Sequence, residues 1–301
     1  MRYRSLSDAM KERFGTKVYR LALTTGATCP NRDGTLGYGG CIFCSEGGSG
    51  EFAAPLLPVK EQIRQAKKRV SAKFSSSIPE EERKFIAYFQ SFTNTYGDED
   101  ALLSMFREAA AEPGICAVAI GTRPDCLSEK IISGLSELNK EVPVWVELGL
   151  QTIHEDTARF IRRGYALPVF EDAAHRLKAA GLEVIVHIIL GLPGETRERM
   201  LETVRYVGDF APRLDGIKIS LLYVLRGTDL ADLYAAGQVP EMTLEEYAAL
   251  IVDCLRILPE DMTVHRLTGD GPKKLLLSPL WSGDKKRVLN TLNRAIREAE
   301  R

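Results

Sequence analysis

The sequence has almost no net charge, few cysteines and no long apolar run, and each shortage excludes a class of protein. A formal net charge of -1 over 301 residues excludes a chain that is basic throughout. Six cysteines are too few for a small scaffold stapled by disulfides. No stretch of about 18 consecutive apolar residues occurs, so we expect no membrane span.

The first ten residues also lack the features of a secretory signal. They are polar and charged, with no apolar core and no small-residue cleavage site. We therefore expect a cytoplasmic protein, in which thiols stay reduced. Clustered cysteines in that compartment are more often metal ligands or catalytic groups than disulfide partners.

What the sequence does contain is an alternation of short apolar strands with helical segments. The apolar and charged fractions, 45% and 27%, are those of a globular protein. Strands are predicted at Val18–Leu23, Phe85–Phe89, Ile115–Ile120, Val144–Leu148, Val184–Leu190 and Ile217–Leu222. Helices are predicted at Val59–Lys73, Glu99–Ala111, Ser128–Asn139, Val169–Ala180 and Glu195–Phe210. The alternation favours an α/β fold with a parallel sheet, and leaves an open sheet, a partial barrel and a full barrel as alternatives.

The pattern changes after about Thr228. Leu244–Leu258 is a helix candidate introduced by Thr243, Thr263–Leu267 is a candidate strand, and the charged tail from Asp284 has helical spacing. We therefore expect two parts: a core barrel with a basic N-terminal segment over residues 1–227, and a mainly helical C-terminal extension over residues 228–301.

Charge is distributed unevenly along the chain. Met1–Arg20 has six basic and two acidic residues, net +4, and Arg266–Arg301 has nine and four, net +5. The middle must then carry about -10 to reach the total of -1. Basic ends are suited to a phosphate backbone. The alternative is that these basic residues only form a solvated helix face, and the small excess of positive charge favours this alternative.

Three cysteines, Cys29, Cys41 and Cys44, lie directly after the first predicted strand with the spacing C-x11-C-x2-C. A C-x2-C pair lets two thiolates reach one metal centre from a tight turn, and glycines in the long gap let the backbone wrap closely. Three thiolates are one short of a closed tetrahedral zinc site. On a cluster of four irons they would leave one iron open to a non-protein ligand.

The other three cysteines are isolated in the sequence. Cys116 lies in an apolar strand and Cys254 on a helix face, where burial is the usual state of a free cysteine. Cys126 follows a strand and could approach the cysteine loop. A zinc-binding module remains an alternative interpretation of that loop.

The cysteine loop resembles that of the radical S-adenosylmethionine (SAM) enzymes. In that superfamily three cysteines bind a [4Fe–4S] cluster, and the open iron binds the amino and carboxylate groups of SAM. The commonest spacing there is C-x3-C-x2-C, whereas the longer gap seen here is similar to that near the elongator catalytic subunit and its bacterial relatives. The chain looks most like a bacterial family related to that subunit but lacking an acetyltransferase domain, from Arg4–Tyr19 through Ser278–Trp281.

This resemblance implies a partial (βα)6 TIM-type barrel that binds a [4Fe–4S] cluster and SAM, with Cys29, Cys41 and Cys44 as the metal ligands. It also implies an electron donor of the flavodoxin or ferredoxin type. One electron then cleaves SAM to methionine and a 5'-deoxyadenosyl radical, which abstracts hydrogen from a substrate.

Polar segments at the ends of the predicted strands match the family in order, and barrels bind ligands at that end. Arg123 would pair with the SAM carboxylate, or Asp125 would cap the next helix. Glu195 follows the G-L-P-G sequence at the start of a predicted helix, where its negative charge favours the helix dipole. The resemblance implies cofactor contacts at Gln90, Ser91, Asn94, Arg123, Glu147, Gln151, His187, Gly191, Leu221 and Tyr223. The alternatives are a polar turn at Gln90–Tyr96 and a satisfied core histidine at His187.

The substrate is the least determined part. His265 and Arg266 precede a glycine-rich loop and would bind a phosphate or carboxylate, unless that loop only closes the barrel. Kinship to the elongator subunit and the basic ends favour tRNA, with a wobble-uridine side chain as target, although the net charge of -1 argues against a large basic footprint. The alternatives are the same chemistry on a small metabolite or peptide, and a non-catalytic iron–sulfur or zinc-binding module.

Overall fold

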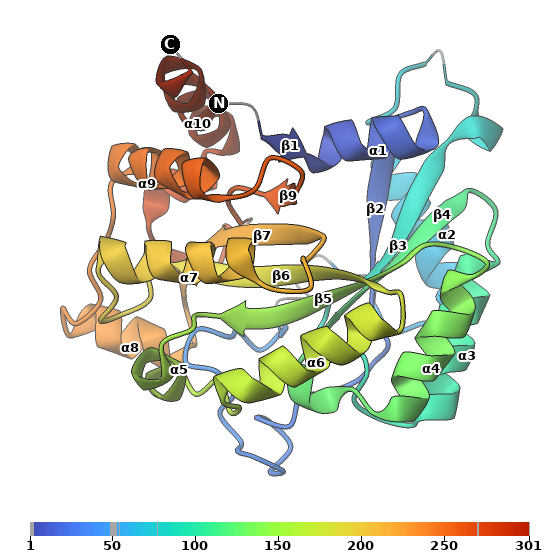
Figure 1. Ribbon diagram of the computed structural model, residues 1–301, viewed down its shortest axis with the longest axis horizontal. Coiled ribbons are helices and arrows are strands. Elements are labelled where there is room, and N and C mark those ends of the chain that lie inside the picture. Colours follow the sequence, from blue (N-terminus) through green and yellow to red (C-terminus); the bar gives the residue numbers. More distant parts are fainter. Residues whose placement is uncertain (1–2, 49–52, 54, 77, 270, 301) are drawn as a thin grey trace.

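A curled parallel sheet with helices on its outside forms the centre of the protein (Figure 1). The structure, a computed structural model, describes residues 3–48, 53, 55–76, 78–269 and 271–300. The sheet has eight strands in the order β1-β9-β7-β6-β5-β4-β3-β2, and every neighbouring pair is parallel. The predicted α/β fold, a partial TIM-type barrel, is confirmed.

Six consecutive strands carry the barrel, and they lie side by side in chain order. They are β2 (Val18–Leu23), β3 (Lys84–Phe89), β4 (Ile115–Thr122), β5 (Val144–Gln151), β6 (Glu183–Leu190) and β7 (Gly216–Leu221). Each begins and ends within three residues of its prediction. On each strand the alternate residues that face the crossover helices are apolar and buried, because these helices cover the outer face of a parallel sheet.

The crossover helices bury one apolar side against the sheet. They are α2 (Val59–Ser71), α3 (Glu99–Ala110), α4 (Glu129–Asn139), α6 (Leu167–Ala179) and α7 (Arg197–Asp209), with a short α5 (Glu155–Phe160) before α6. The Ser128 hydroxyl accepts a hydrogen bond from the Ile131 N–H, which caps the start of α4. Gly181 follows α6 with a φ of 76°, a left-handed conformation that ends the helix.

The N-terminal segment closes one end of the barrel, which the sequence pattern did not predict. β1 (Arg4–Ser5) extends the sheet beside β9, and α1 (Leu6–Phe14) contacts both β9 and β2 (Figure 1). On the inner side of the sheet, Ala9 and Met10 of α1 pack against Ile86 and Trp145. This apolar plug fills the amino-terminal end of the barrel, so the opposite end is left for ligands.

The C-terminal segment is joined to the same sheet. β9 (Thr263–Arg266) pairs with β7, and α9 (Leu244–Ile257) packs against α7 and α10 (Lys285–Ala299). A small antiparallel pair, β8 (Val224–Leu225) with β10 (Leu276–Ser278), lies near α8 (Asp229–Ala235). The division into 1–227 and 228–301 stays a prediction. Every helix in the described part of the chain falls short of the length and hydropathy that a membrane span requires.

Candidate functional site

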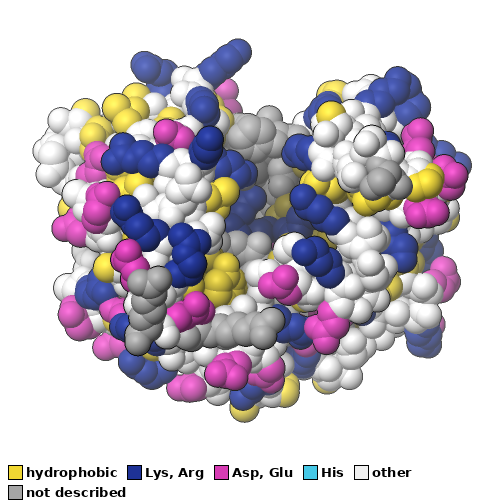
Figure 2. Space-filling view, turned by 90° about the horizontal axis from the view of Figure 1, so that it is seen from above, with side chains coloured by type: hydrophobic (Ala, Val, Ile, Leu, Met, Phe, Trp, Pro, Cys, Tyr) yellow, Lys and Arg dark blue, Asp and Glu magenta, His cyan; other side chains and the backbone are white. Residues whose placement is uncertain are grey.

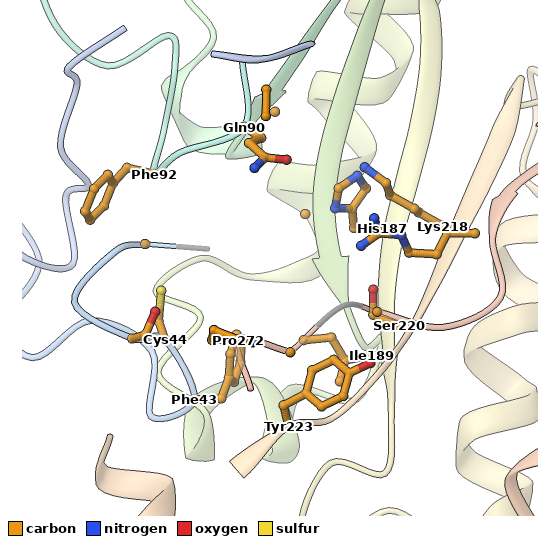
Figure 3. Close-up of a pocket in the computed structure, with 18 of the residues that line it drawn as sticks. Phe43, Cys44, Gln90, Phe92, His187, Ile189, Lys218, Ser220, Tyr223 and Pro272 are labelled. Carbon is orange, nitrogen blue, oxygen red and sulfur yellow. The ribbon is translucent and has the colours of Figure 1, made fainter. Parts of the chain in front are cut away.

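A cavity of about 1380 Å³ extends from the carboxyl ends of the strands into the barrel. Strands β2 to β7 and β9 all contribute to its lining, and so does the cysteine loop. Figure 3 shows Cys44 on one side of the cavity and His187 and Lys218 on the opposite side, with Gln90 at the top of the view. Ligand sites of α/β barrels occupy this end, so the cavity is the candidate site.

The cysteine loop is held in shape mainly by its own backbone. The Arg32 N–H donates to the Cys29 carbonyl at 2.8 Å, and the Cys44 N–H donates to the Cys41 carbonyl at 2.9 Å. Gly34 and Gly40 have φ values of 94° and 71°, which side chains with a Cβ rarely adopt. The sequence therefore bends this segment so that all three cysteines line one cavity.

The three thiols are half-buried and close enough to influence one another. Burial raises the pKa of the Cys41 thiol to about 12; the neighbouring Cys44 and Cys29 thiols act in the same direction, and Arg123 opposes them. In the described part of the chain, no three Cys, His, Asp or Glu side chains converge on a single ion. A cluster binds each thiolate through a different iron, so the thiolates spread more widely than around one zinc ion. The residues present thus fit a cluster better than a zinc site.

The Arg123 side chain is buried next to the cysteine loop. Its guanidinium makes two hydrogen bonds to the Asp125 carboxylate, at 2.9 and 2.7 Å, and one to the Arg163 carbonyl at 3.0 Å. A further N–H points at the Cys29 sulfur, 3.9 Å away. The Asp125 carboxylate is therefore engaged by Arg123, and the alternative in which it caps α4 is wrong because Ser128 caps that helix.

A buried ionic network fills the middle of the barrel around Glu147. Its carboxylate, which has no exposed surface, contacts Arg20 at 3.0 Å, Lys218 at 2.5 Å and His187 at 2.8 Å. Lys218 also donates to the Tyr88 hydroxyl at 2.8 Å. These side chains come from five strands, so the network joins the inner faces of β2, β3, β5, β6 and β7.

The charges of this network fix its protonation. Burial alone would raise the pKa of the Glu147 carboxyl, but Arg20 and Lys218 hold it well below its usual range. Burial lowers the pKa of Lys218, and contact with the Glu147 carboxylate acts in the opposite direction and favours the charged ammonium. Burial and the nearby Lys218 lower the pKa of His187 to about 4, so its imidazole is neutral at pH 7.

The cavity gathers most of the residues predicted from the sequence. Those that line it are Cys29, Cys41, Cys44, Gln90, Arg123, Glu147, Gln151, His187, Leu221, Tyr223 and Arg266. Gln151 ends β5 with a φ of 67°, a left-handed conformation that is uncommon for a residue other than glycine. Such backbone strain is frequent at ligand sites.

Four predicted residues lie outside the cavity lining, and their contacts are structural. The Asn94 side-chain amide donates to the Gly121 carbonyl at 2.9 Å and accepts from the Thr25 hydroxyl. Ser91, three residues earlier in the chain, is buried. Gly191 turns the chain after β6 with a φ of 89°. His265 accepts from Arg20 at 2.8 Å and packs edge-on against Trp145. Asp270, in the loop that follows, is outside the described residues.

Sequence reasoning missed other cavity residues, namely Arg20, Tyr88, Arg163 and Tyr165. Arg20 and Tyr88 are polar residues inside otherwise apolar strands, and that interruption is a usable signal for a side chain that faces the barrel interior. Arg163 and Tyr165 follow α5, which was not predicted, so no pattern marked them.

The cavity lining is strongly basic although the whole chain has a net charge of -1. Among the described residues that line it, Glu147 is the one carboxylate. The cations are Arg20, Arg32, Arg69, Lys73, Arg123, Arg163, Lys218, Arg266, Lys273, Lys274 and Lys285. Figure 2 shows a deep hollow with Lys and Arg side chains on its walls. Acidic residues are therefore concentrated elsewhere, and the cavity favours anionic ligands.

Comparisons with known proteins identify the family. The model of the Radical SAM superfamily matches residues 24–207, and that of the Radical_SAM C-terminal domain matches residues 214–298. The uncharacterized protein YtqA of Bacillus subtilis is 41% identical over 98% of this chain and 89% of its own length. The tRNA uridine(34) acetyltransferase of Methanocaldococcus jannaschii is 31% identical over 56% of this chain and 30% of its own.

Among solved structures, the archaeal Elp3 of Methanocaldococcus infernus has the same fold, with a TM-score of 0.66 and 20% identity. The match covers 92% of this chain and 63% of that one, so this chain spans less than two thirds of the archaeal protein. The predicted kinship to the elongator catalytic subunit is confirmed. Together with the matching family models, these relatives show that the chain belongs to the radical SAM superfamily, whose cofactors are a [4Fe–4S] cluster and SAM.

Proposed function

We propose that the protein abstracts hydrogen from a nucleoside in tRNA, with a wobble-uridine side chain as its target. The observation that carries this proposal is the cavity itself, because among its described lining residues are the three cysteines, eleven cationic side chains and a single carboxylate. A radical formed there would meet an anionic substrate. The relative named a tRNA uridine(34) acetyltransferase supports tRNA over other polyanions.

We assign the residues as follows. Cys29, Cys41 and Cys44 hold the cluster, which together with SAM supplies a 5'-deoxyadenosyl radical when one electron arrives. Gln90, Gln151 and His187 extend toward the same space and are the proposed polar contacts to SAM. Burial and Lys218 keep His187 neutral, and its Nε2 atom donates to the ionised Glu147 carboxylate, so that its Nδ1 atom is left to accept one hydrogen bond. We further propose a flavodoxin or ferredoxin type donor and a cytoplasmic location.

The cavity offers two sets of exposed cations for the RNA backbone. Arg69 lies in the last turn of α2 and Lys73 in the turn that follows it, and Lys273 and Lys274 lie in the loop before β10. The two sets are far apart in the sequence and line the same cavity. Each phosphate contact releases a counterion, so the logarithm of the binding constant should fall steeply with the logarithm of salt concentration.

The test of the substrate compares tRNA nucleosides from cells with and without the gene. We expect one modified uridine to differ between the two. A purified-protein experiment then locates the contact: Lys273→Glu with Lys274→Glu should flatten the salt dependence of tRNA binding by about one unit of slope per contact removed. The matched control is Lys130→Glu in α4 with Lys140→Glu at the residue after it, both outside the cavity lining. Identical nucleosides and identical slopes would count against tRNA.

A further inference from the structure

We propose that Arg123 and Asn31 set the reduction potential of the iron–sulfur cluster by directing N–H groups at the sulfurs of Cys29 and Cys41. The inference concerns the cluster alone, so it stands or falls separately from the tRNA substrate. It also gives Arg123 a different role from the SAM carboxylate contact that the family resemblance implied.

Arg123 is fixed by groups other than the thiol that it approaches. Asp125 holds two of its nitrogens, the Arg163 carbonyl accepts from a third, and the Tyr165 ring lies 5.0 Å from the guanidinium carbon. In this position the Nη1 atom is 3.9 Å from the Cys29 sulfur. The N–H is therefore aimed at the sulfur by its surroundings, whatever the cysteine binds.

Asn31 repeats this arrangement on a second cysteine. It is buried, and its amide nitrogen is 3.6 Å from the Cys41 sulfur while donating to the Arg162 carbonyl at 2.7 Å. The same nitrogen is 3.3 Å from the Arg163 carbonyl. Residues 162–163 thus hold both donors, since their carbonyls accept from Asn31 and from Arg123.

The packing around Gly164 keeps both donors close to the cysteines. Gly164 has a φ of 85°, and a Cβ added there would lie 2.5 Å from the Asn31 amide oxygen and 3.1 Å from an Arg123 nitrogen. A side chain at this position would push both donors away. Asn31 and Arg123 can therefore keep their N–H groups near the sulfurs only because residue 164 is a glycine.

The sign of the effect follows from charge. Reduction adds one electron, from a flavodoxin or ferredoxin in cells or dithionite in vitro, and takes the cluster core from [4Fe–4S]2+ to [4Fe–4S]+. Hydrogen bonds to the cysteine sulfurs and a neighbouring cation stabilise the more negative state and raise the potential. Asp125 offsets part of the Arg123 charge, but its carboxylate binds other nitrogens of the guanidinium than the one that approaches Cys29.

The experiment is a redox titration of the anaerobically reconstituted full chain, followed by electron paramagnetic resonance of the reduced cluster. Arg123→Gln should lower the ratio of reduced to oxidised cluster about tenfold at a fixed donor potential, a shift of about 59 mV for one electron. Arg123→Gln combined with Asp125→Asn should shift it in the same direction by less, since the uncompensated carboxylate is gone. Asn31→Ala should also lower the ratio, by less than Arg123→Gln because its donor is neutral.

The matched control is Arg162→Gln, which removes one positive charge from the same turn. The Arg162 guanidinium pairs with Asp229 and lies against Gly39, and among the described residues its hydrogen bonds do not reach a cysteine sulfur. Its titration should match that of the wild type. Iron content and absorbance confirm cluster loading in every variant. If Arg123→Gln does not load, Arg123→Lys replaces it. Lysine keeps the cation but cannot reach both Asp125 and Cys29, so its midpoint should still fall, by less than that expected for Arg123→Gln. Loaded Arg123 and Asn31 variants with unchanged midpoints would overturn the proposal.

Discussion

The cysteine loop and the Glu147 network face the same cavity, and they are built in opposite ways. The loop is irregular backbone, held by turns and left-handed glycines, and N–H groups of Arg123 and Asn31 approach the sulfurs of Cys29 and Cys41. The network consists of side chains on regular strands, centred on a carboxylate with no exposed surface, and opposite charges contact each other in it. The difference suggests that the loop is built to bind something added after folding, whereas the network is complete when the chain folds.

The largest effect is expected from removing a proposed cluster ligand from the cysteine loop. Cys41→Ala removes one of three proposed ligands and should abolish cluster assembly, because two thiolates cannot hold the cluster. Iron content and visible absorbance after anaerobic reconstitution measure this. Cys116→Ala, a half-buried cysteine in β4 outside the cavity, is the control and should load normally. Full cluster absorbance in Cys41→Ala would refute the ligand assignment.

The second prediction breaks the network. Glu147→Gln leaves Arg20 and Lys218 without their buried carboxylate, and removing one partner of such a pair costs about 3–5 kcal/mol. We expect a lower free energy of unfolding in urea, whereas cluster loading of the folded fraction should persist. The control is Glu183→Gln, whose partner Arg13 is partly exposed, and which should change stability by about 1 kcal/mol or less. Equal stability of the two variants would contradict a central role for Glu147.

The third prediction concerns how the free energy of unfolding depends on pH through His187. Arg20, Lys218 and Glu147 all contact or face His187, and its pKa of about 4 lies below the unfolded value of about 6.5. The unfolded state therefore takes up the proton first, so the stability that His187 contributes is complete above pH 6.5 and declines between pH 6.5 and 4. His187→Asn should reduce this slope by at most about 1.4 kcal/mol per pH unit. Unfolding curves across this range test it, and an unchanged slope would mean that His187 titrates normally.

The smallest effect is expected from a substitution at a glycine of the cysteine loop. Gly34 has a φ of 94°, and an added Cβ would lie 2.7 Å from the ring of Tyr38, an exposed side chain that can move aside. Gly34→Ala should cost about 1 kcal/mol of backbone strain and slow cluster assembly without preventing it. Gly237→Ala, at another left-handed glycine with no neighbour within reach of a Cβ, controls for strain away from the loop. A complete loss of the cluster in Gly34→Ala alone would show that the loop is more rigid than described.

The sequence predicted the six βα units because their strands are apolar and their helices periodic, and both signals are local. It did not predict α1 and β1, since a two-residue strand has no period and its pairing with β9 depends on the tertiary fold. The cysteine loop could be found because its residues are adjacent in sequence. The Glu147 network could not be assembled, because Arg20, Tyr88 and Lys218 meet only when the sheet curls.

The most direct test of the central claim uses tRNA from a strain that lacks the gene. The reconstituted protein receives this tRNA with SAM and dithionite, and both 5'-deoxyadenosine and nucleoside masses are measured. We predict that this tRNA raises 5'-deoxyadenosine formation above the level seen with tRNA from the parent strain, and that one uridine changes in mass. Equal 5'-deoxyadenosine formation with both tRNAs and unchanged nucleosides would contradict a radical SAM enzyme acting on tRNA.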